Sequence, residues 1–493
     1  MQFTSLTFVV FLTIVFSLYW FVRRPRLQNA VIVIASYMFY GWWDYRFCAL
    51  ILFSSLVDYF LSRQIDRSND ASRRKTLLTI SLASNLGLLA LFKYYGFFAD
   101  NFLALAQSFG WTPNDLTLNL ILPVGISFYT FQTMSYTIDV YRRQLKPADH
   151  LVDYLAFVSF FPQLVAGPIE RGTNLLPQFE KPRLFNVADA SDGCRLILWG
   201  FFKKLAVADL LATTVDQHFN HWETATGAEL ALATVFFAFQ IYCDFSAYSD
   251  IAIGTARLFS IRLMRNFAYP YFSQSFTEFW SRWHISLSTW FRDYVYIPLG
   301  GNRVSIGRQK LNIFLTFILS GFWHGAAWTF IAWGVIHGTA LVIQKQFSRT
   351  SSTKPAIDFA HAPQFFLPPV IALKMVLTFT FVCLGWVFFR ADNISSAFAI
   401  VGKVMSEAWQ PQHLGSLMEA ISSEKPLKTS LLVLMIFMLV EWTQRHLECP
   451  LTALTLGRFW IRPVRWVAYS MVILATLDLV SRTDAKTFIY FAF

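Results

Sequence analysis

Residues 3–22 read FTSLTFVVFLTIVFSLYWFV, a run without any charge, and RRPR follows directly at residues 23–26. A helix of about 20 apolar residues is long enough to cross the hydrocarbon core of a bilayer. A cleaved signal peptide carries its positive charges before the apolar run, whereas here they come after it. Because positive charge gathers on the cytoplasmic side, we expect a retained anchor whose N-terminus lies outside.

The composition of the whole chain agrees with a protein that crosses the membrane many times. Of the 493 residues, 55% are hydrophobic and only 14% are charged, whereas soluble domains carry about 25% charge. This balance excludes a soluble enzyme, a disordered scaffold and a disulfide-stapled secreted protein. The five cysteines include no CxxC pair, so they predict neither a redox site nor a zinc site.

The net charge of +11 would suggest a nucleic-acid partner in a soluble protein, but a membrane protein explains it differently. Basic clusters at residues 23–26, 63–75 and 142–146 fall on one side of the membrane when the early spans alternate. Lysine and arginine in cytoplasmic loops set topology. We therefore expect the lipid bilayer, and no nucleic acid, as the partner that this charge reflects.

The hydrophobic segments predict an all-α, polytopic helical bundle. With the first run they total about a dozen, and the others are 28–43, 47–61, 77–98, 121–138, 151–165, 196–215, 230–256, 311–343, 366–389, 431–440 and 467–480. Pro162, Gly167 and Pro168 interrupt the segment at 151–165, and such a break at membrane depth requires cover by protein or a water-filled cavity. A re-entrant segment and a loop at the interface are equal alternatives there.

We expect one membrane-embedded domain with three parts along the chain. These are N-terminal spans in residues 1–120, a core in residues 121–345 and C-terminal spans in residues 366–493. The sequence shows no internal repeat of the kind that many secondary transporters carry.

Polar residues gather in three stretches, and ionisable groups inside a membrane protein point to function. The first stretch, residues 242–250, reads YCDFSAYSD. Asp244 and Asp250 are separated by about 240° around a helix, so their carboxylates need not share a face. A polar network that ties helices together is slightly favoured over direct chemistry for these residues.

The second stretch, residues 265–294, carries aromatic residues at three- and four-residue spacing, which predicts a helical aromatic stripe. His284 belongs to this stripe, and Glu278 and Arg282 have the spacing of an ion pair on one helix. The segment is too charged to face lipid and too aromatic for water, so it lies at the interface or inside the bundle. A single histidine on such a face is as often a core residue as a functional one.

The third stretch, residues 320–328, reads SGFWHGAAW and places His324 among glycines, which permit close approach, and tryptophans, which shape a wall. His337 follows about 20 Å further along an unbroken helix and on another face, so these two histidines are not expected to share a metal. His218 and His221 have a ligand-like gap but no third ligand nearby. We therefore expect no metal site.

A buried histidine without a recognisable nucleophile, metal or phosphate-binding motif fits one kind of reaction. The sequence contains no GxSxG, P-loop or GxGxxG motif. His324 could act as a general base on a hydroxyl or a carrier that attacks an acyl thioester, because imidazole titrates near neutral pH. His284 could orient the hydroxyl or donate a hydrogen bond to the developing oxyanion.

These motifs resemble those of the membrane-bound O-acyltransferase family, in the bacterial branch that includes the alginate O-acetylase and the peptidoglycan and teichoic-acid acyltransferases. The resemblance spans most of the chain and is strongest between about residues 123 and 338. It rests on PQLVAGPI at 162–169, the stretch at 244–250, FWSRWHISLS at 279–288, FWHG at 322–325 and FIYFAF at 488–493.

The resemblance implies that His324 is the catalytic histidine and that His284 occupies the second signature position. It also implies a helical bundle that encloses a tunnel, with the acyl donor entering from one side and the acceptor from the other. We expect the neighbouring side chains to bind the substrates: Trp323, Trp283, Arg282, Asp244, Ser246, Asp250, Asn266 and Arg292.

The function expected from this resemblance is an O-acetyltransferase of the bacterial inner membrane. It would pass acetyl from a cytoplasmic thioester, acetyl-CoA, towards an extracytoplasmic polysaccharide such as an alginate-like exopolysaccharide or peptidoglycan. A separate exported acetyltransferase would complete the transfer, and no tightly bound cofactor is expected. D-alanyl or another acyl transfer is the alternative within the family, and a transporter or flippase is the alternative of another class.

Overall fold

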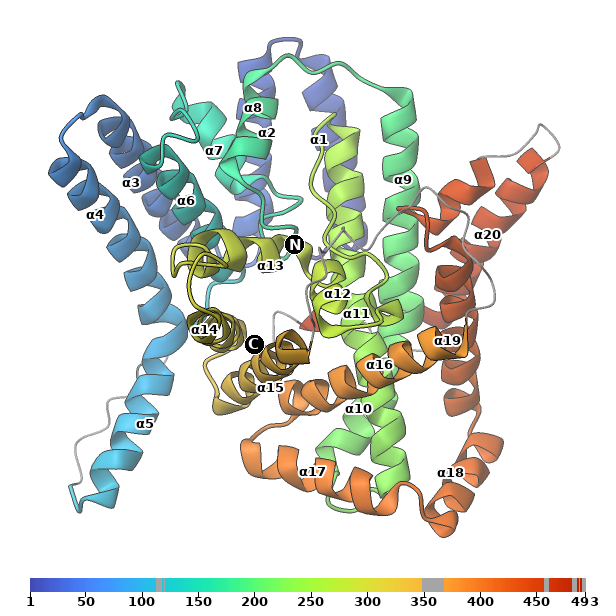
Figure 1. Ribbon diagram of the computed structural model, residues 1–493. Coiled ribbons are helices and arrows are strands. Elements are labelled where there is room, and N and C mark those ends of the chain that lie inside the picture. Colours follow the sequence, from blue (N-terminus) through green and yellow to red (C-terminus); the bar gives the residue numbers. More distant parts are fainter. Residues whose placement is uncertain are drawn as a thin grey trace. The chain divides into compact units, whose positions relative to one another are not determined.

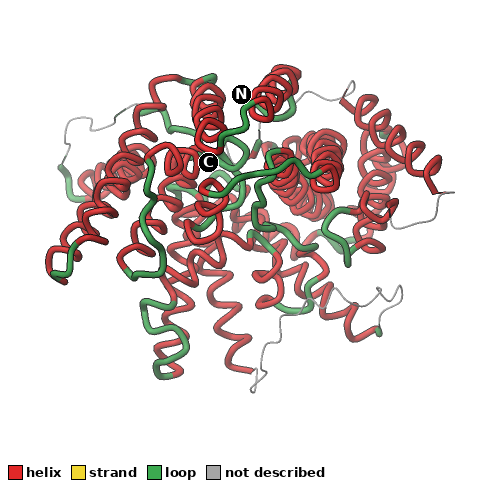
Figure 2. Tube along the Cα trace, turned by 90° about the horizontal axis from the view of Figure 1, so that it is seen from above, coloured by secondary structure: helices red, strands yellow, loops and turns green. Residues whose placement is uncertain are grey.

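The computed structural model describes most of the chain: residues 1–111, 118, 120–347, 368–455, 461–480, 486, 488 and 489. Figure 2 shows helices joined by loops, with no strand in these residues. This confirms the predicted all-α class. Within the described residues, five helices are long and apolar enough to cross a membrane: Tyr45–Arg67, Ala71–Ser108, Gly227–Leu258, Pro369–Arg390 and Lys425–Gln444.

The chain divides into two compact units that interleave in sequence. Unit 1 consists of Met1–Cys194 and Ile251–Met264, and unit 2 consists of Arg195–Asp250 and Arg265–Phe493. One boundary falls within the long helix α11 (Gly227–Leu258).

Unit 1 is built mainly from the N-terminal helices (Figure 1). They are α1 (Leu6–Phe21), α2 (Pro25–Gly41), α3 (Cys48–Arg67), α4 (Ala71–Leu89), α5 (Tyr95–Ser108), α6 (Ile126–Tyr141), α7 (Leu151–Ser159), α8 (Gly172–Glu180) and the start of α9 (Val187–Phe201). A short π-helix, η2 (Ala90–Tyr94), joins α4 to α5. The two helices therefore continue one another over 38 residues.

Hydrogen bonds between side chains hold α3, α4 and α6 together inside unit 1. The carboxylate of Asp58 is buried and accepts from Ser81 Oγ at 2.5 Å and from Asn85 Nδ2 at 2.8 Å. Asn85 Oδ1 in turn accepts from Ser54 at 2.6 Å and Thr133 at 3.2 Å. Such interhelical bonds stabilise membrane bundles because lipid offers no competing partners.

The segment that carries Pro162 leaves the helical conformation, as its sequence predicts. Helix α7 ends at Ser159, and residues 160–170 form buried turns. Gly125 packs against this segment with a φ of +78°, and a Cβ there would lie 2.8 Å from the carbonyl oxygen of Leu164. Only glycine fits such a close approach with a left-handed backbone. The depth of the segment in the bilayer stays a prediction.

Unit 2 contains the remaining helices (Figure 1). They are the end of α9, α10 (Asp209–Asn220), most of α11, α12 (Phe276–Arg282), α13 (Ile285–Phe291), α14 (Ile306–His324), α15 (Trp328–Phe347), α16 (Pro369–Arg390), α17 (Ile394–Glu407), α18 (Pro411–Ser423), α19 (Lys425–Gln444) and α20 (Ile461–Val480). Two π-helices, η3 (Phe202–Ala208) and η5 (Arg292–Tyr296), follow α9 and α13 directly.

The apolar segment at 311–343 is a helical hairpin rather than one helix. Helix α14 ends at His324, Gly325 has an extended backbone, and α15 begins at Trp328. The two helices pack closely because a Cβ on Gly321 would lie 2.2 Å from the Phe330 carbonyl oxygen, and one on Gly334 would lie 2.4 Å from the Phe317 carbonyl oxygen. Small residues allow this approach of two backbones.

The aromatic stripe of residues 276–294 is interrupted as well. Helix α12 ends at Arg282, and His284 adopts a left-handed conformation with φ of 43° and ψ of 54° before α13 begins. The prediction of a continuous helical stripe is therefore wrong at this point. A non-glycine residue in this conformation costs roughly 1–3 kcal/mol and is typical of functional sites.

Candidate active site

His324 is the last residue of α14 and lies in an aromatic enclosure. Its side chain is 5% exposed. The ring centroid of Trp333, on α15, is 5.0 Å from that of the imidazole, and the ring of Phe389, on α16, is 5.4 Å away. Helices α14, α15 and α16 thus position this histidine together, in apolar surroundings from which bulk water is largely excluded.

His284 is fully buried, and its orientation is fixed by one asparagine. Its Nδ1 lies 3.1 Å from Asn266 Oδ1. The same oxygen accepts from the backbone N–H of Ser286 at 3.2 Å and from Ser286 Oγ at 2.9 Å. Since a backbone N–H can only donate, the atom facing it is an acceptor, and His284 Nδ1 must carry a proton to bond it. Nε2 of the neutral imidazole is then an acceptor.

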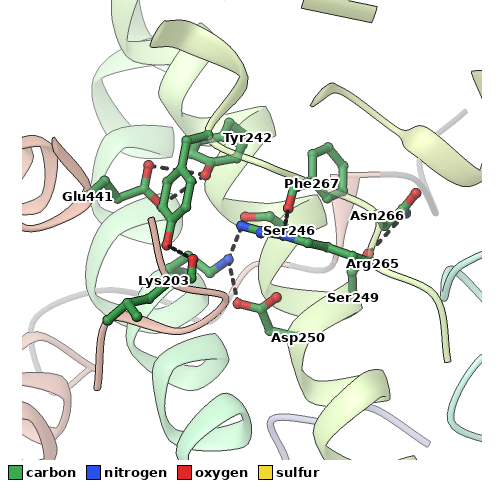
Figure 3. Close-up of polar contacts among 11 residues, drawn as sticks. Lys203, Tyr242, Ser246, Ser249, Asp250, Arg265, Asn266, Phe267 and Glu441 are labelled. Atoms are coloured by element: carbon green, nitrogen blue, oxygen red, sulfur yellow. Dashed lines mark hydrogen bonds and ion pairs between the residues drawn. The ribbon is translucent and has the colours of Figure 1, made fainter. Parts of the chain in front are cut away.

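Asn266 itself is buried and held by two sets of contacts. Its Nδ2 donates to Ser249 Oγ at 3.1 Å (Figure 3). Its backbone carbonyl accepts from the N–H of Ile285 at 2.9 Å, and the N–H of Ala268 donates to the carbonyl of Arg282 at 2.9 Å. The loop after Arg265 therefore runs alongside the break between α12 and α13, and this pairing maintains the left-handed turn at His284.

Trp323 brings the two histidines into one cluster. Its ring centroid is 6.2 Å from that of His284 and 5.1 Å from that of His324. The ring of Phe245, from α11, packs edge-on against His284 at 4.6 Å. Unit 2 therefore assembles both predicted histidines around Trp323, although His324 ends α14, His284 precedes α13, and they are forty residues apart (324 − 284 = 40).

The acidic residues of the first stretch form ion pairs with two lysines that sequence reasoning missed. Lys203 Nζ donates to Ser246 Oγ at 2.7 Å and pairs with Asp250 Oδ2 at 2.8 Å (Figure 3). Lys204 Nζ lies 2.6 Å from Asp244 Oδ1, and it also pairs with Asp209 on α10. These pairs link η3 and α10 to α11, as expected of a network that ties helices together.

A further carboxylate extends this polar layer. Tyr242 OH donates to the two oxygens of Glu441, on α19, at 2.8 and 3.1 Å (Figure 3). Near the end of the chain, the backbone N–H of Ile489 donates to Asp244 Oδ2 at 2.8 Å, and the ring of Phe488 lies 4.7 Å from Lys204 Nζ. Two residues of the C-terminal aromatic motif thus contact the lysine pairs, and the rest of that motif lies outside the described residues.

The remaining predicted site residues differ in their surroundings. Arg282 pairs with Glu278 at 2.6 Å, which confirms the predicted ion pair. Trp283 is buried, and its ring centroid is 5.0 Å from that of Trp386. The side chain of Arg292 is 59% exposed and pairs with its neighbour Asp293, so its described contacts do not include the histidine cluster.

The predicted separation of His324 and His337 is wrong, because the helix between them is broken. Both rings contact Trp333, at 5.0 Å for His324 and 4.9 Å for His337. In the described part of the chain, no three His, Cys, Asp or Glu side chains are grouped to hold a metal ion. His218 Nδ1 bonds the carbonyl of Thr214 within its own helix at 2.8 Å.

Comparisons with known proteins place the chain in a class. The model of the membrane-bound O-acyltransferase family matches residues 143–384. A probable alginate O-acetylase AlgI of Pseudomonas putida is 36% identical over the full length of both chains. The protein is a multi-pass membrane O-acyltransferase and belongs to the membrane-bound O-acyltransferase family.

Two further relatives indicate which members of the family the chain is similar to. A probable alginate O-acetylase AlgI of Pseudomonas aeruginosa is 40% identical over 84% of this chain and 77% of its own. A peptidoglycan O-acetyltransferase of Helicobacter pylori is 35% identical over 77% of this chain and 74% of its own. The predicted alternative of a transporter or flippase is set aside, because these relatives and the family are acyltransferases.

Proposed function

We propose that the protein passes an acetyl group from a cytoplasmic thioester, acetyl-CoA, towards an extracytoplasmic polysaccharide, with His324 as general base. The observation that carries this proposal is the cluster of His324, Trp323 and His284, in which one buried imidazole ends helix α14 and the other is fixed by Asn266. The activities of the named relatives, alginate O-acetylase and peptidoglycan O-acetyltransferase, support acetyl as the group and a polysaccharide as its destination.

The proposed reaction needs one proton to move out and back. His324 accepts the proton of the acceptor hydroxyl while its oxygen forms a bond to the acyl carbon. The carbon–sulfur bond of the thioester breaks, and the leaving thiolate takes the proton from His324. The histidine is neutral again at the end, and the products are an ester and a free thiol. The aromatic enclosure favours this step because it keeps competing water away from the thioester.

The hydrogen bond to Asn266 favours one of the two roles expected for His284. With Nδ1 as donor to Asn266, the neutral ring offers Nε2 as an acceptor. An acceptor can orient an attacking hydroxyl, whereas it cannot donate a hydrogen bond to an oxyanion. We therefore assign to His284 the orientation of the hydroxyl that His324 deprotonates.

Delivery to the glycan requires a second component in this proposal. The protein lies in the bacterial inner membrane with its N-terminus outside, and a separate exported acetyltransferase receives the acetyl group. The basic clusters at residues 23–26, 63–75 and 142–146 then face the cytoplasm, where they favour an anionic donor such as acetyl-CoA.

The test is acetyl transfer by purified protein in nanodiscs, with isotope-labelled acetyl-CoA and release of free CoA as the readout. Removal of a general base typically lowers a rate by about 10²–10⁴-fold, so His324→Ala should lose at least about 10²-fold. His218→Ala is the matched control, because that ring bonds only its own helix in the described contacts.

Comparison of surface-glycan acetylation in cells with the wild-type gene, the His324→Ala gene and no gene then tests the acceptor. Full acetylation by a stably inserted His324→Ala protein would contradict the role of His324. Transfer of D-alanine in place of acetyl would support the alternative donor instead.

A further inference from the structure

A third histidine, His337 on α15, is enclosed by aromatic rings and is absent from the proposed mechanism. It is fully buried. Its ring centroid is 4.9 Å from that of Trp333 and 5.2 Å from that of Trp280. Phe279 stacks on it with an interplanar angle of 11°. Aromatic pairs of this kind prefer defined orientations, so the position of each ring depends on its neighbours.

Hydrogen bonding does not explain why a histidine occupies this position. Neither Nδ1 nor Nε2 of His337 has a hydrogen-bond partner among the residues that the structure describes. A buried polar group in that state costs roughly 1–3 kcal/mol. A purely apolar residue would avoid this cost. The presence of a histidine here must therefore be explained by the shape and position of its ring.

The backbone of α16 lies close against the His337 ring. A Cβ added to Gly385 would lie only 2.6 Å from His337 Nε2. This distance is shorter than real Cβ contacts, so the glycine at residue 385 leaves only enough space for the small five-membered ring. His337 therefore occupies a narrow gap between the α16 backbone and the indole of Trp333.

Trp333 connects this gap to the candidate active site. It is fully buried, and its indole contacts His337 at 4.9 Å and His324 at 5.0 Å. The contact with His324 is nearly perpendicular, at 83°. If the His337 ring is displaced, the Trp333 indole that it contacts can move as well, and this indole forms one wall of the His324 enclosure.

We propose that His337 is a positioning residue that fixes the orientation of His324 through the indole of Trp333. The proposal rests on the proposed function of His324 as general base. A general base must lie within hydrogen-bond reach of its proton, and a misplacement of about 1 Å can cost about 10²-fold in rate. His337 touches no reacting atom in this arrangement.

Two substitutions, one of the ring itself and one of the α16 residue beside it, test the proposal. His337→Ala removes the ring that contacts Trp333, and Gly385→Ala adds a methyl so close to the ring that the ring must shift. Each should lower kcat for acetyl transfer by about tenfold or more while KM for acetyl-CoA changes by less than about twofold, with rates normalised to monodisperse folded protein. Gly402→Ala in α17 is the matched control, because a Cβ there meets no atom within 4 Å.

The double variant His337→Ala/Gly385→Ala measures whether the two positions act through one contact. When the ring is absent, the added methyl has nothing to displace, so the second substitution should cause no additional loss. Multiplicative losses in the double variant would overturn the proposal, and so would a His337→Ala protein with kcat close to wild type.

A chemical readout separates this proposal from the proposed function. Diethyl pyrocarbonate modifies accessible imidazoles, and mass spectrometry of the peptides gives the rate at His324 and at His284 in one sample. His337→Ala should accelerate modification of His324 at least about threefold relative to His284, whether or not His324 is the base. Equal acceleration at both histidines, or none, contradicts positioning. Unchanged transfer by His324→Ala contradicts only the proposed function.

Discussion

At the residue scale, the sequence predicted that His324 and His284 are site residues, but it did not predict the contacts that hold their side chains. FWHG and WSRWHIS mark His324 and His284 as unusual, because each places an imidazole among tryptophans in an apolar region. Asn266 was named as a site residue, yet its hydrogen bond to His284 spans 18 positions in sequence. No local pattern predicts that contact, since it depends on the pairing of two irregular segments in space.

Replacement of Asn266 should remove the hydrogen bond that orients His284. Asn266→Ala removes the acceptor shared by His284 Nδ1 and the N–H and Oγ of Ser286. Buried donors left without a partner cost about 1–3 kcal/mol each. We therefore expect a lower melting temperature in nanodiscs and a loss of kcat of about tenfold or more, because the tautomer of His284 is no longer selected.

Ser249→Ala is the control for this substitution. It removes one acceptor of Asn266 Nδ2 but leaves Oδ1 and its three contacts in place, so kcat should stay within about threefold of wild type. If Asn266→Ala keeps the wild-type kcat, the orienting role of His284 is wrong.

At the element scale, apolar runs predicted which segments are helical but not where the helices break. The run at 311–343 is continuous in hydropathy, and only its glycines indicate that two backbones meet there. The run at 196–215 contains Lys203, Lys204 and Asp209, but three charges among twenty residues did not change its interpretation as a span. Two of the three acidic partners of the lysines, Asp244 and Asp250, lie on α11, so only the fold reveals those pairs.

The hairpin of α14 and α15 should depend on one glycine far more than on another in the same helix. At Gly321 a Cβ would meet the carbonyl oxygen of Phe330 at 2.2 Å, whereas at Gly307 nothing lies within 4 Å. Gly321→Ala should therefore separate the helices, displace His324 three residues later and reduce acetyl transfer by about 10²-fold.

Gly307→Ala is the control, and helix propensity predicts that it stabilises α14 by up to about 1 kcal/mol with activity retained. Thermal unfolding in nanodiscs and the transfer assay measure both variants. Similar behaviour of the two proteins would show that the close approach at Gly321 is not what positions His324.

At the scale of the whole molecule, composition predicted a multi-pass membrane protein, because the chain has few charged residues and they are unevenly distributed. Basic residues gather in the clusters at 23–26, 63–75 and 142–146, and another set of charges lies buried around Lys203 and Asp250. The first set is expected to fix topology, and the second forms ion pairs inside unit 2. Removal of one partner from a buried pair leaves an uncompensated charge, which is why such charges occur in pairs.

The predicted topology places the N-terminus outside and the connection between α3 and α4 in the cytoplasm. Both Gln2 and Asn69 are exposed, so each can carry a single cysteine in a background in which the five natural cysteines are replaced by alanine. In spheroplasts, a membrane-impermeant maleimide should label Gln2→Cys at once and Asn69→Cys only after permeabilisation. The physical reason is that the membrane potential and the translocation machinery retain the arginines and lysine of 63–75 on the cytoplasmic side. Labelling of Asn69→Cys in sealed spheroplasts would reverse the orientation of α3 and α4, and with it the side from which acetyl-CoA is proposed to enter.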